Sequence, residues 1–193
     1  GEETKSGKEA VNTLVNIYNK WIPRERIITT NVWSSELTKL VSNAMLAQRI
    51  SSINSISAIC EKTGANIEEV SRAIGMDARI GPHFLKPSIG FGGSCFKKDI
   101  LNLVYISRLY GLNEVASYWE SVVDINYYQT ERFGQKIISC MPAKNSILTI
   151  LGWSFKKDTN DSRESSSIYL AKKILLKGYK IKIYDPMVDK IKI

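Results

Sequence analysis

A single cysteine inside a glycine-rich segment is the strongest chemical feature of the sequence. The segment GFGGSCFKKD, residues 90–99, places Cys95 after three glycines and before Lys97 and Lys98. Nearby cations and a helix N-terminus both favour a thiolate, and a helix is predicted to begin near Asp99. The glycines also allow backbone amides to approach a ligand closely. We therefore predict that Cys95 is a nucleophile; the alternative is an inert thiol in a loop.

Three further polar residues have a spacing that fits a site, although each has a structural alternative. Lys39 and Asn43 lie four residues apart on a long predicted helix and therefore share one face, where a solvated polar stripe is the simpler explanation. Asp99 is either a carboxylate at a helix start or a base near the thiol. Cys60 and Cys140 fall within or at the end of predicted helices, and both are interpreted as inert.

A second segment with binding chemistry joins a predicted strand to a predicted helix. It has the sequence GWSFKKDTNDSRES, residues 152–165. In doubly wound folds, ligands bind at the carboxyl ends of the strands, where such a loop lies. The segment lacks the GxGxxG fingerprint of a dinucleotide site, but Lys156 and Arg163 suit a ligand that carries phosphate. Asp185, after the next strand, is either a ribose ligand or, more simply, a turn residue.

Helical periodicity dominates the chain up to Pro142. The longest helix carries apolar residues on more than one face, which predicts a central buried helix shared with another subunit. Residues 76–95 lack periodicity, and an aperiodic segment of that length inside a compact domain is typical of a binding loop. The segment RIITT, residues 26–30, predicts a short strand. Helices are predicted at 6–21, from Ser34 or Ser35 to about Lys62, from Asn66 to Gly75, at about Asp99–Tyr110, and from the Asn113 cap to about Cys140, closed by Pro142.

The pattern changes after Pro142. The β-branched run SILTILG, the amphipathic segment SSSIYLAKKILLKG and the alternating run YKIKIYDP predict a strand, a helix and a second strand. This is a βαβ unit, which opens a parallel, doubly wound sheet. The predicted fold class is therefore α/β overall, with a mainly helical region around one long helix followed by the first βαβ unit of a second domain.

Composition excludes several classes of protein. The chain has 193 residues, 44% of them hydrophobic and 24% charged, and no apolar run approaches the length of a membrane span. The chain has three cysteines and one histidine, and their spacing does not fit a metal site. This argues against a disulfide framework and a zinc site, and favours a reducing, intracellular setting. The formal charge of +8 is scattered, which argues against a nucleic-acid module and leaves open an anionic ligand or a basic surface without a partner. The first residues lack an initiator Met and a signal region, so we expect that the sequence begins within a longer chain.

Three segments carry a family resemblance that extends over essentially the whole chain. GFGGSCFKKD, NVWSSELTKLVSNAMLAQRISSINSISAICE and LGWSFKKDTNDSRESSSIYL resemble the UDP-glucose/GDP-mannose dehydrogenase family, and in particular its animal-type UDP-glucose 6-dehydrogenases. The resemblance implies the tail of an N-terminal NAD-binding Rossmann domain at 1–30, a central helical dimerisation domain at 31–142, and the start of a C-terminal UDP-binding Rossmann-like domain at 143–193. Two departures are Trp153, where phenylalanine is common, and Lys97, where glutamine or proline is common.

The resemblance also implies a reaction. Family enzymes oxidise C6 of UDP-glucose twice, consume two NAD⁺ and release UDP-glucuronate in the cytoplasm. Cys95 would be the nucleophile that forms a thiohemiacetal and then a thioester. Lys39 would stabilise the oxyanion, Asn43 would hydrogen-bond near the same oxygen, and Asp99 would help to activate the hydrolytic water. Without the upstream glycine-rich NAD loop, this chain alone is expected to be inactive.

The remaining site residues also follow from the resemblance. The expected partners are UDP-glucose, the cofactor NAD and a second copy of the chain bound through the central helix, with a higher homo-oligomer beyond that; no metal, nucleic acid or membrane is expected. Two alternatives stay open: a sibling nucleotide-sugar dehydrogenase of the GDP-mannose type, and a non-catalytic dimerisation core.

The resemblance assigns the binding residues by the part of the ligand that they would contact. The glucose and diphosphate would be held by Lys86, Ser88, Phe91 and Gly92, with Phe84 beside them, and Arg79 would reach the substrate of a neighbouring subunit. The UDP part would contact Phe155 and Lys156, and NAD would lie near Lys98 and Arg163.

Overall fold

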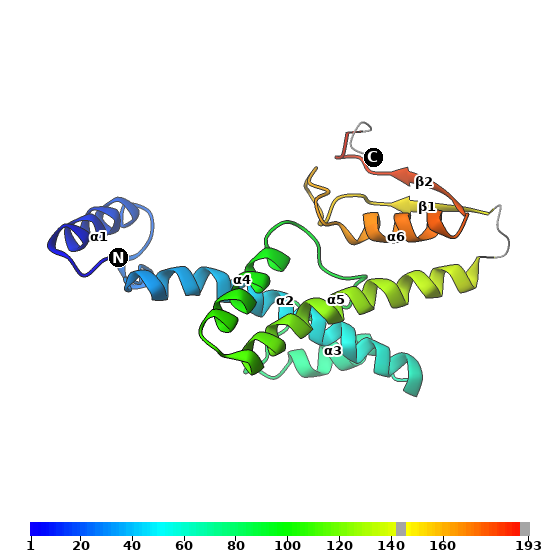
Figure 1. Cartoon of the computed structure of the whole chain (residues 1–193), viewed down its shortest axis with the longest axis horizontal. Coiled ribbons are helices and arrows are strands. Elements are labelled where there is room, and N and C mark those ends of the chain that lie inside the picture. The colour runs from blue at the N-terminus through cyan, green and yellow to red at the C-terminus, as the bar shows by residue number, and fades with distance from the viewer. Residues whose placement is uncertain (142–145, 190–193) are drawn as a thin grey trace. The chain divides into compact units, whose positions relative to one another are not determined.

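The computed structural model describes residues 1–141 and 146–189 (Figure 1). Within it the chain divides into two compact units, Gly1–Ser42 and Asn43–Ile193, and we describe each by itself. No helix of the described residues combines the length and apolarity that crossing a bilayer requires.

The first unit contains one complete α-helix, α1 (Lys5–Tyr18), and the 3-10 turn η1 (Arg24–Arg26). The Thr4 hydroxyl caps α1 by accepting a hydrogen bond from the Gly7 amide at 3.0 Å. The strand predicted at RIITT is wrong: the chain passes through η1 and then runs on without a regular element. A strand needs a neighbour for its backbone groups, and the only ladder among the described residues lies far along the chain, between β1 and β2.

Helix α2 (Val32–Thr63) is the long helix that the sequence predicted. It begins two residues before Ser34 because Asn31 provides the cap: the Asn31 side-chain oxygen accepts a hydrogen bond from the Ser34 amide at 2.8 Å. It ends at Gly64, which takes a φ of +78°. The part of α2 in the second unit buries one face and leaves Met45, Ile56 and Ile59 on an exposed apolar stripe.

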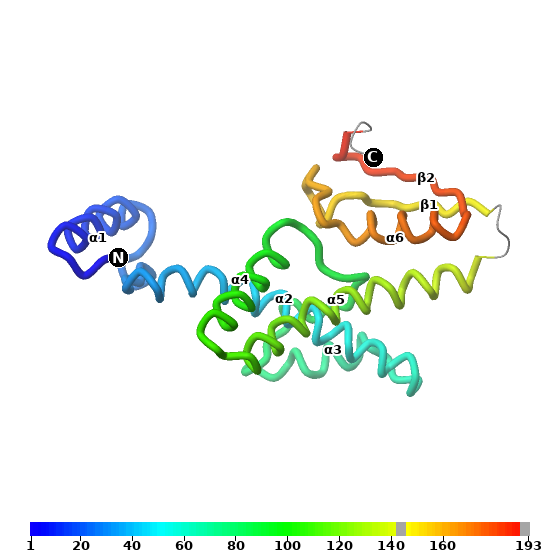
Figure 2. The backbone as a smooth tube through the Cα atoms, viewed as in Figure 1, coloured from blue at the N-terminus to red at the C-terminus, as the bar shows by residue number. Residues whose placement is uncertain are grey.

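Three helices follow in the second unit: α3 (Ile67–Gly75), α4 (Phe96–Leu109) and α5 (Asn113–Cys140). Asn66 caps α3 as predicted. Helix α4 starts three residues earlier than predicted, so Cys95 is its N-cap and Asp99 lies within its first turn. Leu112, not Asn113, is the N-cap of α5. The irregular segment between α3 and α4 can be followed in Figure 2.

Helices α4 and α5 pack against each other and bury a shared apolar core, which includes Ile100, Val104, Val122 and Val123. This core fixes the first turn of α4, and therefore the position of Cys95, relative to the middle of α5.

The C-terminal segment confirms the predicted βαβ unit. Strands β1 (Ile147–Leu151) and β2 (Lys180–Tyr184) are parallel, and helix α6 (Ser166–Leu176) connects them. Alternate strand residues face a small core built on Trp153, Ala171 and Val188. The predicted α/β class is therefore correct, with a helical region followed by a parallel βαβ unit. Pro142, the expected end of α5, lies outside the described residues.

Candidate active site

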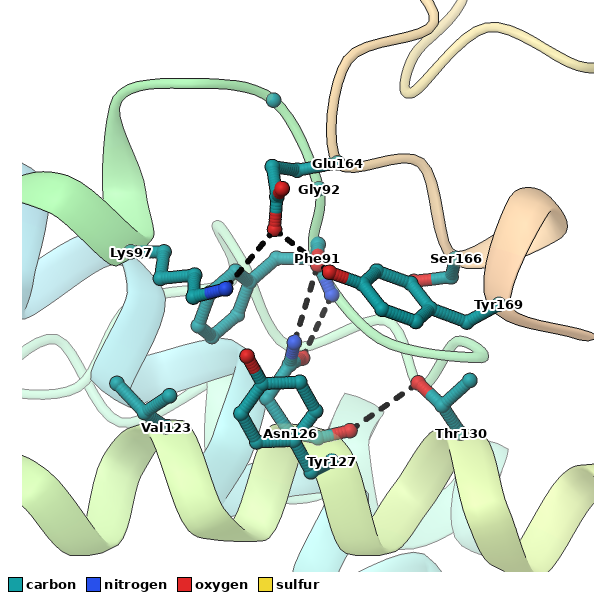
Figure 3. Close-up of a pocket in the computed structure, with 11 residues that line it drawn as sticks. Phe91, Gly92, Lys97, Val123, Asn126, Tyr127, Thr130, Glu164, Ser166 and Tyr169 are labelled. Atoms are coloured by element: carbon teal, nitrogen blue, oxygen red, sulfur yellow. Dashed lines mark hydrogen bonds and ion pairs between the residues drawn. The ribbon is translucent and has the colours of Figure 1, made fainter.

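The segment before Cys95 is held by three side chains on one face of α5. The Asn126 amide pairs with Phe91 in both directions: its oxygen accepts from the Phe91 N–H at 2.7 Å and its nitrogen donates to the Phe91 carbonyl at 3.0 Å. Gln129 donates to the Ser88 carbonyl at 2.6 Å, and Thr130 donates to the Ile89 carbonyl at 2.8 Å. The Asn126–Phe91 pair is visible in Figure 3. Polar side chains thus replace the hydrogen bonds that regular secondary structure would supply.

Helix α2 holds the same segment through two more side chains. The buried Asn54 accepts a hydrogen bond from the Ser88 amide at 2.8 Å. Arg49 donates to three carbonyls, those of Ile80, Gly81 and His83, at 2.8–2.9 Å. A guanidinium has five donors in a rigid plane, which suits a turn whose carbonyls converge. We name residues 76–95 the cysteine loop from here on.

The glycines of the cysteine loop are needed for contact with a second loop, residues 152–165, which we name the β1–α6 loop. A Cβ atom on Gly92 would overlap the carbonyl oxygen of Glu164. Gly93 has a φ of +82°, and a Cβ there would lie 2.8 Å from the ring of Phe155. The Gly93 amide also donates to the Arg163 carbonyl at 3.0 Å. The two segments that the sequence singled out separately therefore meet backbone to backbone.

Cys95 lies where these loops meet, exposed, at the N-cap position of α4. The exposure fits a reactive thiol, and the helix N-terminus fits a thiolate. The Ser94 hydroxyl lies 4.0 Å from its sulfur. Cys60 is buried inside α2, as expected of an inert thiol, and Cys140 is exposed at the last residue of α5.

Asp99 lies one turn after Cys95 and is fully buried. Its Oδ2 accepts a hydrogen bond of 2.6 Å from the Asn43 amide, which joins two of the predicted catalytic residues. Asp99 is therefore a carboxylate in the first turn of α4, one of the two alternatives that the sequence left open, and it is buried and bonded to Asn43. A buried carboxylate is expected to be held by polar partners, and here it fixes the orientation of the Asn43 side chain. Lys39 stands four residues before Asn43 on α2, in the other compact unit.

The cations near Cys95 differ from the prediction. Lys97 was expected to favour the thiolate, but its Nζ lies 3.0 Å from a carboxylate oxygen of Glu164 and 5.4 Å from the centre of the Tyr127 ring. Lys98 is exposed. Arg163 donates to Asp161 at 2.7 Å; that hydrogen bond, the charge of Asp161 and, to a smaller extent, the charge of Cys95 raise the pKa of Arg163.

The β1–α6 loop is fixed by Asp185 at the end of β2. Its carboxylate accepts hydrogen bonds from the amides of Trp153, Ser154, Met187 and Val188 at 2.7–3.0 Å. These bonds, led by the one from Trp153, hold the pKa of Asp185 well below its usual range. The structure thus supports the turn interpretation of Asp185. The loop it fixes carries Phe155 and Lys156, whose Nζ lies 5.4 Å from the centre of the Phe155 ring.

The other predicted binding residues have varied surroundings. Arg79 is exposed and paired with Asp77 at 2.6 Å. Phe84 is 43% exposed and adopts a φ of +59°, a left-handed conformation that is rare for a bulky residue. Lys86 and Ser88 are exposed, whereas Phe91 is buried against Phe96 in an edge-to-face contact of 5.7 Å between ring centres. Within the part of the chain that the structure describes, no group of three or more His, Cys, Asp and Glu residues could hold a metal ion.

Known proteins share this arrangement. Residues 33–128 match the central domain of the UDP-glucose/GDP-mannose dehydrogenase family, and residues 149–193 match its UDP binding domain. The proteins named UDP-glucose 6-dehydrogenase from Bos taurus and Gallus gallus are each 57% identical over 192 residues, which is 98% of this chain and 39% of the relative. The structure of a UDP-glucose dehydrogenase from Pyrobaculum islandicum aligns with a TM-score of 0.83 at 29% identity, covering 93% of this chain and 41% of that one.

The fold, the cysteine loop and these matches agree on one class of enzyme, the nucleotide-sugar dehydrogenases. The chain belongs to the UDP-glucose/GDP-mannose dehydrogenase family, which confirms the resemblance seen in the sequence. It spans about two fifths of the length of the curated relatives it matches, 39% for the two mentioned.

Proposed function

We propose that the full-length protein oxidises UDP-glucose to UDP-glucuronate in two NAD-dependent steps, with Cys95 as the nucleophile. The observation that carries this proposal is an exposed thiol at a helix N-terminus, one turn from the Asn43–Asp99 hydrogen bond of 2.6 Å. The names of the relatives at 57% identity support the substrate.

The chemistry balances around C6 of the sugar. The first oxidation removes a hydride from C6 and the hydroxyl proton, and leaves an aldehyde. The Cys95 thiolate adds to this carbon, and the resulting oxygen anion takes up a proton to give a thiohemiacetal. Loss of that proton and a second hydride gives a thioester, which water hydrolyses to the carboxylate with release of the thiol. NAD, when bound, supplies the hydride acceptor for each oxidation.

The side chains around Cys95 take the following roles in the proposal. Lys39 stabilises the oxyanion on the C6 oxygen, and Asn43 donates a hydrogen bond near the same atom. Asp99 orients the Asn43 amide and helps to activate the hydrolytic water. The cations Lys98 and Arg163 suit the phosphates of NAD, because both side chains are exposed to solvent and can reach a bound ligand.

The binding groups come from both loops. The cysteine loop supplies Lys86, Ser88, Phe91 and Gly92 to the glucose and diphosphate, with Phe84 beside them. Arg79, exposed at the surface, reaches the substrate of a neighbouring subunit. The β1–α6 loop supplies Phe155 and Lys156 to the UDP part.

A homodimer through α2 completes the proposal. The motivating observation is the exposed apolar stripe of Met45, Ile56 and Ile59, with Met45 49% and Ile59 57% exposed. Residues 1–30 are assigned to the NAD domain, 31–142 to the dimerisation domain and 143–193 to the UDP domain.

Replacing Cys95 in the full-length enzyme tests the proposal. We expect Cys95→Ser to abolish steady-state formation of UDP-glucuronate, measured by chromatography, while UDP-glucose still binds. A hydroxyl has a much higher pKa than a thiol and is the poorer nucleophile here. Cys140→Ser is the matched control, because Cys140 is also exposed, and it should turn over normally. Normal turnover by Cys95→Ser contradicts the mechanism, and a preference for GDP-mannose over UDP-glucose contradicts the substrate.

A further inference from the structure

Four side chains from four different elements meet at the first turn of α4, and none of them has a role in the mechanism above. They surround a cavity of about 20 Å³, together with Phe91 and Asn126 (Figure 3). We name this group the 97–164 cluster. Its members are Lys97 of α4, Glu164 of the β1–α6 loop, Tyr127 of α5 and Tyr169 of α6.

The members of the cluster contact one another closely. Glu164 accepts from Lys97 at 3.0 Å and from the Tyr169 hydroxyl at 2.7 Å on the same carboxylate oxygen. Lys97 also lies 5.4 Å from the centre of the Tyr127 ring, and the rings of Tyr127 and Tyr169 meet edge to face with centres 6.2 Å apart. The carboxylate therefore joins Lys97 and Tyr169, and Tyr127 contacts both of these groups.

Two observations indicate that the four elements are in close contact at the cluster. A volume of about 20 Å³ has room for about one water molecule and none for a sugar nucleotide. Glu164 has a φ of +52°, a conformation that favours glycine or asparagine, so its backbone is held in a strained state that directs the carboxylate towards Lys97.

The electrostatics agree with tight contact. Hydrogen bonding to the Tyr127 side chain, followed by the bond to Glu164, raises the pKa of Lys97. The hydrogen bond from Tyr169, followed by that from Lys97, lowers the pKa of Glu164. Both groups are therefore charged across the neutral range, and their ion pair is present whenever the enzyme works.

The position of the cluster suggests what it does. Lys97 stands two residues after Cys95 in the first turn of α4, and Glu164 directly follows Arg163, whose carbonyl accepts from the Gly93 amide. One side-chain bond and one backbone bond thus flank Cys95 and tie it to the β1–α6 loop. The loop itself is fixed at its other end by Asp185.

We propose that the 97–164 cluster is a positioning device that sets the place of the Cys95 sulfur relative to a nucleotide held by the β1–α6 loop. This rests on the proposed function for the nature of that nucleotide, a UDP-sugar. The cluster acts on catalysis through Cys95 and does not touch the reacting atoms. Loss of the Lys97–Glu164 pair frees the start of α4 from the loop, and the sulfur is then held less accurately at C6.

A double-mutant cycle in the full-length enzyme tests the proposal, with Lys97→Met, Glu164→Gln and the double variant. Each single change should lower kcat about tenfold and leave KM for UDP-glucose within about twofold, because alignment and not binding is affected. The double variant should be no slower than the slower single variant, because both changes break one interaction. Arg108→Gln is the matched control: it breaks an ion pair with Glu120 of 2.6 Å at the other end of α4, and kcat should not change.

A second measurement does not depend on turnover. Iodoacetamide labelling of Cys95, followed by peptide mass spectrometry, gives its rate with and without UDP. In the unmodified enzyme and in Arg108→Gln, bound UDP should change the rate of Cys95 labelling. In Lys97→Met and Glu164→Gln the UDP-dependent change in the labelling rate should be lost while calorimetry still detects UDP binding. If Cys95→Ser forms UDP-glucuronate normally, the proposed mechanism is wrong. The rates of Cys95 labelling with and without UDP still test whether the cluster positions Cys95.

The outcomes that overturn the proposal are distinct. An unchanged kcat in both single variants, with UDP-dependent labelling retained, shows that the cluster only packs elements together. The same conclusion follows if Lys97→Met and Arg108→Gln lower the unfolding temperature equally and neither lowers kcat. Multiplicative losses in the double variant show that Lys97 and Glu164 act separately.

Discussion

The two loops that meet beside Cys95 are held in place by different means. The cysteine loop makes its main hydrogen bonds to side chains distant in sequence, for example Asn126, which is 35 residues from Phe91. Most of those side chains are neutral amides or hydroxyls. The β1–α6 loop depends on carboxylates instead: Asp161 turns the chain at Arg163, and Asp185 collects four backbone amides. The comparison indicates that changes in side-chain shape should destabilise the cysteine loop. Changes in side-chain charge should destabilise the β1–α6 loop.

The largest expected effect is on the boundary between the loops. Gly92→Ala places a methyl group on the Glu164 carbonyl oxygen, a backbone atom that cannot rotate away. We expect the variant to lose about 3 kcal/mol of stability, as for other overpacked sites. Calorimetric unfolding measures the loss. Gly111→Ala is the control for strain without crowding, because Gly111 has a positive φ of +72° and open space around it. Equal losses in the two variants contradict close contact between the loops.

The second prediction concerns the neutral hydrogen bonds of the cysteine loop. Asn126→Ala removes both partners of the buried Phe91 backbone and leaves an N–H and a carbonyl without their hydrogen bonds. We expect a loss of about 2 kcal/mol, independent of pH between 5 and 9, because no charge is involved. Unfolding curves at several pH values check this. A loss of stability in Asn126→Ala that varies with pH contradicts the assignment.

The smallest effect is expected for the charge of Asp185, and this effect should be present at neutral pH and disappear in acid. The pKa of Asp185 is lowered by the bonds from Trp153, Ser154 and Met187, in that order. A lowered pKa stabilises the fold above the pKa of the unfolded chain, about 3.9, and this contribution is lost as the pH falls through the folded value. Asp185→Asn keeps an oxygen acceptor and should therefore lose stability mainly above about pH 4, with a flatter stability profile in acid. If the two profiles stay parallel from pH 7 down to the acid limit, the charge of Asp185 does not contribute.

Local sequence patterns predicted the elements well because helices and parallel strands are defined by short-range periodicity. The βαβ unit and the long helix α2 follow from such patterns, and Cys95 at a helix start follows from its glycines and lysines. The strand at 26–30 failed because β-branched residues indicate a strand only where a neighbour exists. The start of α4 was placed too late because Cys95 itself is the N-cap, without any side-chain capping bond.

The partners of the site residues could not be predicted from the sequence. Lys97 pairs with a carboxylate 67 residues away, a contact that its position next to Cys95 in the sequence does not indicate. Arg49 and Asn126 had no local signal for their contacts with the cysteine loop. One signal was present, however: Asn54, Ser57 and Gln129 are polar residues at buried positions of helices, and buried polar groups need partners. Such positions could have been identified as anchors for the aperiodic segment.

The long sequence separation of the bonds from Arg49, Gln129 and Thr130 also has a consequence for the order of folding. These bonds join the cysteine loop to residues 31–41 positions away, on α2 before it and on α5 after it. Closing such intervals costs chain entropy before any contact repays it, whereas helices form from neighbours within a few residues. We therefore expect the loop that presents Cys95 to take its final conformation after α2 and α5 have formed, so that the Cys95 thiol is positioned late in folding.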